Sequence, residues 1–272
     1  MQGRFSPLIG GRIQAFPWGH WQSEFELAQR NGFGLMEWTL DQEELHDNPL
    51  MTEAGRAEIA GLRRRHGLEI PSLTGDCFMQ APFWKSEGSE RQLLQRQFIE
   101  VVNACAQIGI SLIVVPLVDN GRLENAGQEA ALTGFLAEQA GLLEQQGMRI
   151  VFESDQQPDE LARFIDRLDV RRFGVNYDIG NSAALGYDAE EEIAAYGQRI
   201  LNVHVKDRVR GGTTVSLGTG HAEFDKVFAA LGRIGYAGSY ILQTARATDD
   251  AHAQTLCRYR DMTLAWISQH AA

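Results

Sequence analysis

The sequence predicts a closed (β/α)8 barrel, a TIM barrel, that forms one domain over residues 1–272. Short apolar runs alternate with longer amphipathic stretches at intervals of about thirty residues, which is typical of strand–helix units around a parallel sheet. Eight such units in about 250 residues match the usual size of this barrel. No linker rich in Pro, Gly or Ser interrupts the series. A doubly wound open sheet is the alternative arrangement of the same units.

Eight short apolar segments are the predicted strands. In chain order they cover residues 1–5, 35–40, 68–73, 111–117, 149–154, 173–178, 200–205 and 239–244. Because parallel strands of a barrel all end on one side, the loops that leave them form one shared mouth, where catalytic residues gather. Polar residues near the ends of the predicted strands are therefore the first candidates for a functional site.

The segments between these strands have the periodicity of amphipathic helices. Between residues 90 and 109 an apolar stripe recurs at spacings of three and four, formed by Leu94, Phe98, Val101, Val102 and Cys105. Several of these segments end in glycine, which favours the left-handed backbone at a helix C-terminus. The other clear helical segments cover residues 20–32, 52–67 and 129–147.

The composition excludes several classes of function. With 25 Lys and Arg against 36 Asp and Glu, the net charge of -11 repels nucleic acids and anionic membranes. Three scattered cysteines indicate neither a disulfide framework nor a thiolate zinc site. No stretch approaches the ~20 apolar residues that span a bilayer, and the first residues lack the apolar core of a signal peptide. We therefore expect a cytoplasmic protein with a small-molecule partner.

Polar side chains stand near the ends of four consecutive predicted strands, at Glu153, Asp178, His204 and Gln243. Carboxylate, imidazole and amide groups are suitable ligands for a divalent cation such as Mn, Mg, Co or Zn. Each residue alone also has a structural explanation, such as an ion pair, a helix cap or a buried histidine. Four at corresponding positions favour a metal site. Glu37, in the second predicted strand, is a candidate for substrate binding.

Five motifs resemble the xylose-isomerase-like superfamily of sugar phosphate isomerases and epimerases. Between residues 151 and 246 they are VFESD, NYDIGNS, VHVKD, LGTGHAEFDKVFAALGRIGYAG and YILQTAR. Within the superfamily the chain most resembles 3-epimerases of L-ribulose or L-xylulose 5-phosphate. The resemblance implies a catalytic divalent metal with four protein ligands, at Glu153, Asp178, His204 and position 243.

The same resemblance assigns further residues of these motifs. Asn181 in DIGN matches a position near the substrate, and Lys206 with Asp207 completes the HVKD signature. Gly218 and Gly220 match a loop that contains glycines in the family. For Lys206 and Asp207 a local ion pair is the ordinary alternative.

The sequence departs from the family at position 243. Relatives end this strand with a glutamate that binds the metal and also transfers protons, whereas this chain has Gln243. An amide oxygen can bind a cation, but an amide is not a general base near neutral pH. Three residues are candidates for a replacement second acid/base group: Asp207, His221 and Asp155.

The expected chemistry is proton abstraction next to a sugar carbonyl, with Glu153 as base and a metal-stabilised enediolate. Epimerisation at C3 needs proton transfer on both faces, whereas aldose–ketose isomerisation needs one face. The sequence therefore predicts a divalent-metal-dependent isomerase or epimerase of a keto sugar or sugar phosphate. The inert amide of Gln243 favours the one-base isomerisation.

Two loop residues are further candidates for substrate binding. Arg246 follows the last predicted strand and either holds a phosphate or carboxylate through a bidentate contact or remains a solvated cation. Trp84, with Lys85 in the loop QAPFWKSEG, either forms a lid that excludes water or a contact between subunits of a homo-oligomer. The sequence does not choose between these alternatives.

Three other functions compete with this prediction. A sugar-keto or cyclitol dehydratase of the same superfamily shares the metal and the proton abstraction but expels a hydroxyl. A non-catalytic sugar-binding barrel is suggested by Gln243 and opposed by the retained Glu153, Asp178 and His204. A DNA-repair endonuclease needs more histidines at strand ends and a basic face, and this acidic chain has seven histidines, none at the other strand ends.

Overall fold

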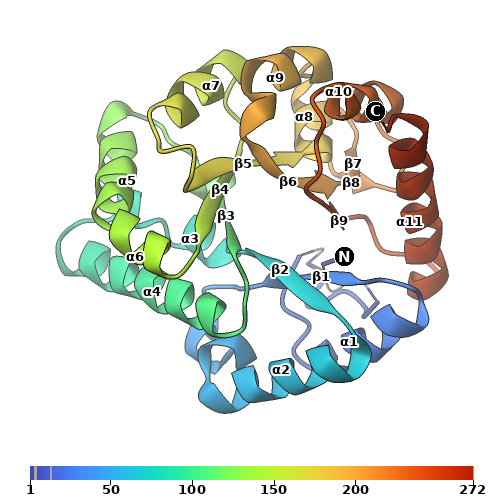
Figure 1. Cartoon of the computed structure of the whole chain (residues 1–272), viewed down its shortest axis with the longest axis horizontal. Helices are drawn as coiled ribbons and strands as arrows, with labels where there is room; N and C mark the ends of the chain where they lie inside the picture. Colours follow the sequence, from blue (N-terminus) through green and yellow to red (C-terminus); the bar gives the residue numbers. More distant parts are fainter. Residues whose placement is uncertain (3–4, 13, 272) are drawn as a thin grey trace.

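The computed structural model describes residues 1–2, 5–12 and 14–271 of the chain. Seven parallel strands form one sheet that curls into a nearly closed barrel with the helices around it (Figure 1). The strand order is β1-β2-β3-β4-β5-β6-β9, so each strand pairs with its neighbours along the chain. This order confirms the predicted barrel and excludes the doubly wound sheet, whose strand order reverses at a switch point.

The strands of the barrel coincide with seven of the eight predicted segments. β3 and β5 are buried at every position, as expected for parallel strands covered on both faces. The bounds are β1 (Leu35–Thr39), β2 (Glu69–Thr74), β3 (Leu112–Leu117), β4 (Arg149–Ser154), β5 (Phe173–Asp178), β6 (Ile200–Val205) and β9 (Ser239–Leu242).

The predicted first strand, residues 1–5, is not a strand in its described residues, and residues 3–4 lie outside the described part. Met1 still pairs with β1. Its amine donates to the Leu35 carbonyl at 3.2 Å, and the Glu37 N–H donates to the Met1 carbonyl at 2.8 Å. The start of the chain therefore lies along β1, where an eighth strand would pair.

The helices surround the barrel, and α3 and α8 begin within two residues of the ends of β2 and β5. The segment predicted as one helix over residues 129–147 is two helices, because Gln139 leaves the helical geometry at φ −86° and ψ 1°. The bounds are α1 (Trp21–Arg30), α2 (Glu53–His66), α3 (Asp76–Gln80), α4 (Gly88–Gln107), α5 (Ala126–Glu138), α6 (Ala140–Gln145), α7 (Pro158–Asp166), α8 (Ile179–Leu185), α9 (Ala189–Tyr196), α10 (Phe224–Arg233) and α11 (His252–Gln269).

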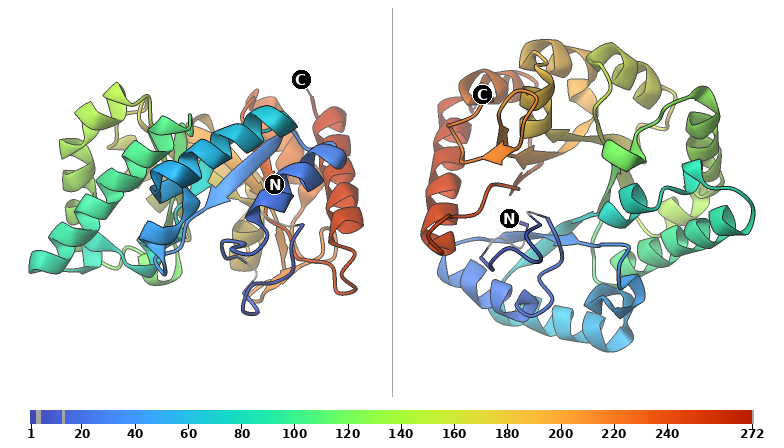
Figure 2. Two further views of the ribbon diagram at one scale, coloured as in Figure 1. Left: turned by 90° about the horizontal axis from the view of Figure 1, so that it is seen from below. Right: turned by 180° about the vertical axis from the view of Figure 1, so that it is seen from behind.

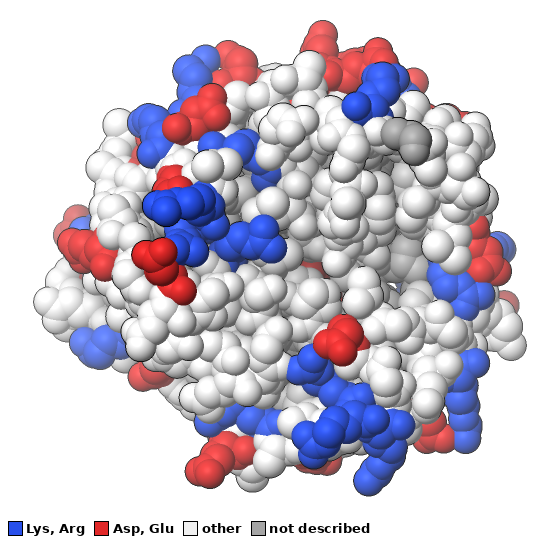
Figure 3. Space-filling model, in the orientation of Figure 1, with Lys and Arg blue, Asp and Glu red and all other residues white. Residues whose placement is uncertain are grey.

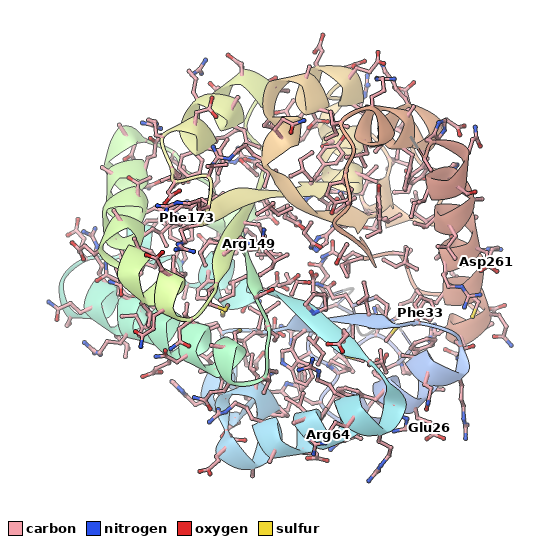
Figure 4. All side chains as sticks on the ribbon, in the orientation of Figure 1. Glu26, Phe33, Arg64, Arg149, Phe173 and Asp261 are labelled. Carbon is pink, nitrogen blue, oxygen red and sulfur yellow. The ribbon has the colours of Figure 1, made fainter. Side chains whose placement is uncertain are left out.

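We call the end of the barrel at which the strands terminate the mouth. Figure 2 (left) shows the segment before α1 together with the loops that follow β6 and β9 at this end. One of these loops contains an antiparallel pair of short strands, β7 (Asp207–Arg208) and β8 (Thr214–Val215). Side chains fill the inside of the barrel, and Arg149 and Phe173, which begin β4 and β5, mark the opposite end (Figure 4). Among the described residues, no helix is both long and apolar enough to cross a lipid bilayer.

Candidate active site

Three of the four predicted metal ligands converge at the mouth. Glu153, Asp178 and His204 come from the adjacent strands β4, β5 and β6, and Asp178 and His204 are register partners. His204 Nδ1 is 3.1 Å from Glu153 Oε2 and 3.8 Å from Asp178 Oδ2. One ligand atom of each residue lies within 4.8 Å of the others, and all three residues are buried. Two carboxylate oxygens and an imidazole nitrogen at these separations fit a divalent cation. We call these residues the ligand cluster.

Glu37 determines which nitrogen of His204 faces the ligand cluster. Glu37 Oε1 is 2.8 Å from His204 Nε2, and both side chains are fully buried. The hydroxyls of Ser72 and Thr74 on β2 donate to the same carboxylate, each at 2.6 Å. An Nε2–H donated to Glu37 leaves Nδ1 directed toward the two carboxylates of the cluster, which is how metal-binding histidines are commonly held. Glu37 therefore lies beneath the cluster, where it supports His204.

Glu37 and His204 stabilise each other's charges. Burial raises the pKa of Glu37, but the charge of His204 and the hydrogen bonds to the carboxylate outweigh burial and lower the pKa to about 2. Burial lowers the pKa of His204, whereas the charge of Glu37 and the hydrogen bonds to Glu153 and Glu37 raise it to about 10. His204 Nδ1 would have to give up its proton to hold a metal.

Two amides hold the two oxygens of Glu153. Asn176 Nδ2 donates to Oε2 at 2.8 Å, and Asn181 Nδ2 donates to Oε1 at 2.7 Å. Asn181 is itself fixed. Its backbone N–H donates at 2.8 Å to Asp178 Oδ1, which caps α8, and its side-chain Oδ1 accepts a hydrogen bond from Arg208 at 2.7 Å. The carboxylate of Glu153 thus has one defined orientation.

Gln243 is connected to the ligand cluster through Lys206. The Lys206 ammonium donates to Asp178 Oδ2 at 2.9 Å and to Gln243 Oε1 at 2.5 Å, and all three residues are buried. Gly180 makes room for the lysine, because a Cβ there would lie 2.7 Å from Lys206 Cγ. Gln243 therefore presents its oxygen beside the cluster and shares one cation, the Lys206 ammonium, with Asp178.

Asp207 anchors the loop that contains the two glycines. Its Oδ2 accepts the N–H groups of Gly218 at 2.9 Å and Gly220 at 2.8 Å, and its Oδ1 accepts the N–H of Ala222 at 3.1 Å. A Cβ at Gly220 would collide with Asp207 Oδ1, so the close approach of the loop depends on glycine. The carboxylate of Asp207 is occupied by the backbone of this loop.

His221 and Asp155, the other predicted proton-transfer groups, lie outside the ligand cluster. His221 is exposed, and its Nδ1 accepts the N–H of Arg210 at 3.1 Å. Asp155 is ion-paired with Arg122, with 2.5 Å between the nearest atoms. Burial raises the pKa of Asp155, and the hydrogen bond and charge of Arg122 oppose that rise. The structure gives neither residue a contact with Glu153.

Trp84 and Arg246, predicted to bind substrate, each bond a backbone carbonyl of another segment. Trp84 is 1% exposed, donates its Nε1–H to the Gly121 carbonyl at 3.1 Å and packs edge-on against Phe83. Its large apolar ring is therefore part of the core, with its polar atom satisfied, and is not a lid. Arg246 Nε donates to the Ser6 carbonyl at 2.7 Å and joins the segment after β9 to the N-terminal segment.

A cavity of about 240 Å³ adjoins the ligand cluster. Its wall includes Asn181, Arg208, Arg122 and Asp155. Asn181 lines the cavity and donates to Glu153, so a molecule in the cavity lies one side chain from Glu153. Concave sites with a few fixed polar groups are the usual binding places of small polar ligands.

Sequence reasoning missed the amides that hold the cluster. Asn176 and Asn202 precede Asp178 and His204 by two positions, so they lie on the same face of their strands. Asn202 Nδ2 donates to Asn176 Oδ1 at 2.8 Å and to Glu37 at 3.0 Å. The spacing of two residues between each asparagine and the predicted ligand after it indicates that both side chains lie on one face of the strand.

Comparisons with known proteins agree with this architecture. The model of the family described as xylose isomerase-like TIM barrel matches residues 25–260. L-ribulose-5-phosphate 3-epimerase UlaE of Salmonella paratyphi A is 24% identical over 277 residues, which cover 97% of this chain and 95% of that protein. The protein of the same name from Escherichia coli strain SMS-3-5 has the same identity and coverage.

Solved structures have the same fold. The IOLI protein with a bound zinc atom has a TM-score of 0.75 and 17% identity, over 92% of this chain and 94% of that one. D-psicose 3-epimerase with D-tagatose from Clostridium cellulolyticum H10 has a TM-score of 0.72 and 15% identity, over 93% and 94% of the two chains. Because the family model spans most of the sequence, the chain belongs to the xylose isomerase-like TIM barrel family.

Proposed function

We propose that the protein is a divalent-metal-dependent isomerase or epimerase of a keto sugar or sugar phosphate, with Glu153 as the base. The observation that carries this proposal is the ligand cluster at the mouth, in which Glu37 directs His204 Nδ1 toward two carboxylates. Named relatives that match nearly the whole chain are sugar phosphate epimerases, and the solved structures of the same fold include sugar epimerases.

The donor set fits a divalent cation such as Mn, Mg, Co or Zn. Glu153, Asp178 and His204 would hold it, with the oxygen of Gln243 as a fourth donor. When bound, the cation supplies positive charge that stabilises the negative charge developing on the substrate oxygens as a proton leaves the neighbouring carbon. A neighbour of the same fold with a bound zinc atom supports this assignment.

Glu153 removes the proton beside the carbonyl. Asn176 and Asn181 donate to its two oxygens and prevent the carboxylate from rotating away from the substrate. Arg208 fixes the amide of Asn181 and also lines the adjoining cavity, where the polar end of a sugar can lie. A base held in one orientation keeps the short, aligned contact that proton transfer needs.

The partner in this proposal is a small polar molecule and the location is the cytoplasm. On the face opposite the mouth, Lys and Arg are mixed with Asp and Glu around the rim, with positive side chains over α2 (Figure 3). Cys77, Cys105 and Cys257 are free thiols, which fits a reducing compartment.

Product analysis tests the proposal. Mn²⁺-loaded protein is incubated with L-ribulose 5-phosphate, L-xylulose 5-phosphate and free ketopentoses and ketohexoses, and the products are separated by chromatography. We expect conversion of at least one ketose to its C3 epimer or aldose isomer, lost on chelation and slowed about 10²–10⁴-fold by Glu153→Gln. Glu138→Gln, an exposed position on α5, is the matched control. Conversion at the normal rate by the Glu153 variant, or no conversion of any sugar by folded, metal-loaded protein, contradicts the proposal.

A further inference from the structure

A second and larger hollow opens beside the cavity that adjoins the ligand cluster. It measures about 530 Å³ and lies between α5 and α7, which are neighbours in the outer ring of helices (Figure 1). Residues 155–157, which follow β4, form part of its wall. We call this hollow the outer groove, and the proposed function gives it no role so far.

The outer groove and the cavity meet at one ion pair. Arg122 and Asp155 line both spaces, and the nearest atoms of their charged groups are 2.5 Å apart. The cavity of about 240 Å³ is smaller than the about 300–1,000 Å³ of typical small-molecule sites, whereas the two spaces together fall within that range. A molecule whose reacting end lies beside Asn181 can therefore extend past Arg122 into the outer groove.

The positive charges of the outer groove are already neutralised. Of the described residues that line it, three are arginines, and each has a carboxylate partner. The pairs are Arg122 with Asp155, Arg163 with Asp159, and Arg167 with Glu129. A phosphate placed there would have to break one of these pairs, and it would also meet the carboxylates of Glu124 and Glu160, which line the same hollow. The outer groove therefore favours a neutral group over an anion.

The wall of the outer groove suits the hydroxyl groups of a sugar ring. A hydroxyl both donates and accepts, so it can bond a paired carboxylate and guanidinium without separating them. Gln156, another wall residue, has a buried Oε1 that no donor in the described part of the chain reaches, so this amide has a hydrogen bond left to make. The ring of Tyr187, whose hydroxyl donates to the Asp155 carbonyl at 2.9 Å, adds apolar surface for the C–H face of a sugar.

We propose that the outer groove binds a second sugar ring, so that the substrate is a ketose that carries a neutral glycosyl group. This inference rests on the proposed function, because Glu153 acts on the ketose part while the outer groove holds the glycosyl part. The link between the two sugars passes the pair of Arg122 and Asp155. The outer groove thus determines which ketose binds and takes no part in proton transfer.

A tryptophan placed in the outer groove provides the test variant. Ala126, the first residue of α5, is exposed and lines the outer groove, and it is not among the residues that line the cavity. Ala137, three turns later on the same helix, is also exposed and lines neither space. Ala126→Trp fills the outer groove, and Ala137→Trp is the matched control that adds the same side chain elsewhere on α5.

Turnover is compared between short and extended ketoses. Mn²⁺-loaded proteins are given D-fructose, L-ribulose 5-phosphate, and isomaltulose and lactulose, two disaccharides that keep a ketose with a free carbonyl. We expect the wild type to convert at least one disaccharide with a kcat/KM at least about tenfold above that for D-fructose, because hydrogen bonds in the outer groove add to binding. Ala126→Trp should remove this advantage, mainly through KM, and Ala137→Trp should keep it.

Two results of this comparison overturn the inference and leave the proposed function standing. The first is a wild type that converts D-fructose or L-ribulose 5-phosphate but shows no advantage for either disaccharide, or an advantage that Ala126→Trp retains. The second is a loss in Ala126→Trp that is confined to L-ribulose 5-phosphate, which means that the outer groove receives a phosphate.

Saturation-transfer difference NMR tests the outer groove without turnover. Protein loaded with Mg²⁺, which is diamagnetic and leaves the sugar signals sharp, is mixed with isomaltulose. We expect saturation of the glucosyl protons with the wild type and Ala137→Trp, and a clear loss of it with Ala126→Trp. Glucosyl protons that stay unsaturated, or that Ala126→Trp leaves equally saturated, overturn the inference. A wild type that converts no sugar overturns the proposed function, and the glucosyl signals then still decide whether the outer groove binds a sugar ring.

Discussion

At the scale of single residues, one hydrogen bond decides which nitrogen of His204 is available to a metal. Glu37 holds Nε2, so Nδ1 faces the ligand cluster. We expect Glu37→Gln to weaken Mn²⁺ binding about 10–100-fold, because the amide lacks the charge that supports the imidazole and can present its NH₂ group instead of oxygen. Isothermal titration calorimetry measures this, with Glu138→Gln, an exposed position on α5, as control. If Glu37→Gln binds Mn²⁺ as tightly as the wild type does, Glu37 does not orient His204 for the metal.

Lys206 is a cation that already occupies two of the four expected donors. Its ammonium bonds Asp178 and Gln243, so a metal that uses those oxygens meets a positive charge at close range. Lys206→Met keeps much of the side-chain volume and removes the charge. We expect tighter Mn²⁺ binding in this variant, by about tenfold or more for charges in a buried site. Weaker binding, measured by the same titration, means that Lys206 supports the metal instead of competing with it.

At the scale of elements, Glu192 fastens α9 to its neighbours. Its carboxylate accepts hydroxyl hydrogen bonds from Tyr177 on β5 at 3.0 Å, Ser182 on α8 at 2.8 Å and Tyr196 on α9 at 2.8 Å. Glu192→Ala leaves these buried hydroxyls without their acceptor, so we expect a loss of about 2–3 kcal/mol in the free energy of unfolding. Urea denaturation measures it, and the exposed Glu191→Ala is the control. If Glu192→Ala lowers the free energy of unfolding no more than Glu191→Ala does, the hydrogen bonds of Glu192 do not stabilise the packing of α9.

Glu192 also makes the stability of this region depend on pH. Burial raises its pKa above the ordinary value of 4.5, against the hydrogen bonds from Ser182, Tyr196 and Tyr177. The folded protein therefore binds this proton more tightly than the unfolded chain does. The stabilisation that comes from this tighter proton binding is fully present below pH 4.5. It is lost from the free energy of unfolding as the pH rises through the raised pKa of Glu192. Glu192→Gln, which does not titrate, should show a smaller fall in unfolding free energy over that interval, and an identical fall contradicts the assignment.

At the scale of the whole molecule, regular patterns made the barrel and the ligand cluster predictable. The strand–helix alternation indicated the fold, and parallel strands place residues such as Glu153, Asp178 and His204 at a common end. The roles of loop residues depend on partners far along the chain. Trp84 bonds a carbonyl 37 residues away and Arg246 one 240 residues away, and no local pattern encodes such contacts.

The central claim is that Glu153 takes a proton from the carbon beside a sugar carbonyl. Deuterium incorporation tests it most directly: Mn²⁺-loaded protein and a converted ketose are mixed in heavy water, and the sugar is followed by NMR. We expect deuterium at C1 or C3 with the wild type and none with Glu153→Gln. A sugar that the wild type converts without acquiring deuterium at either carbon would contradict proton abstraction into a solvent-exchangeable base.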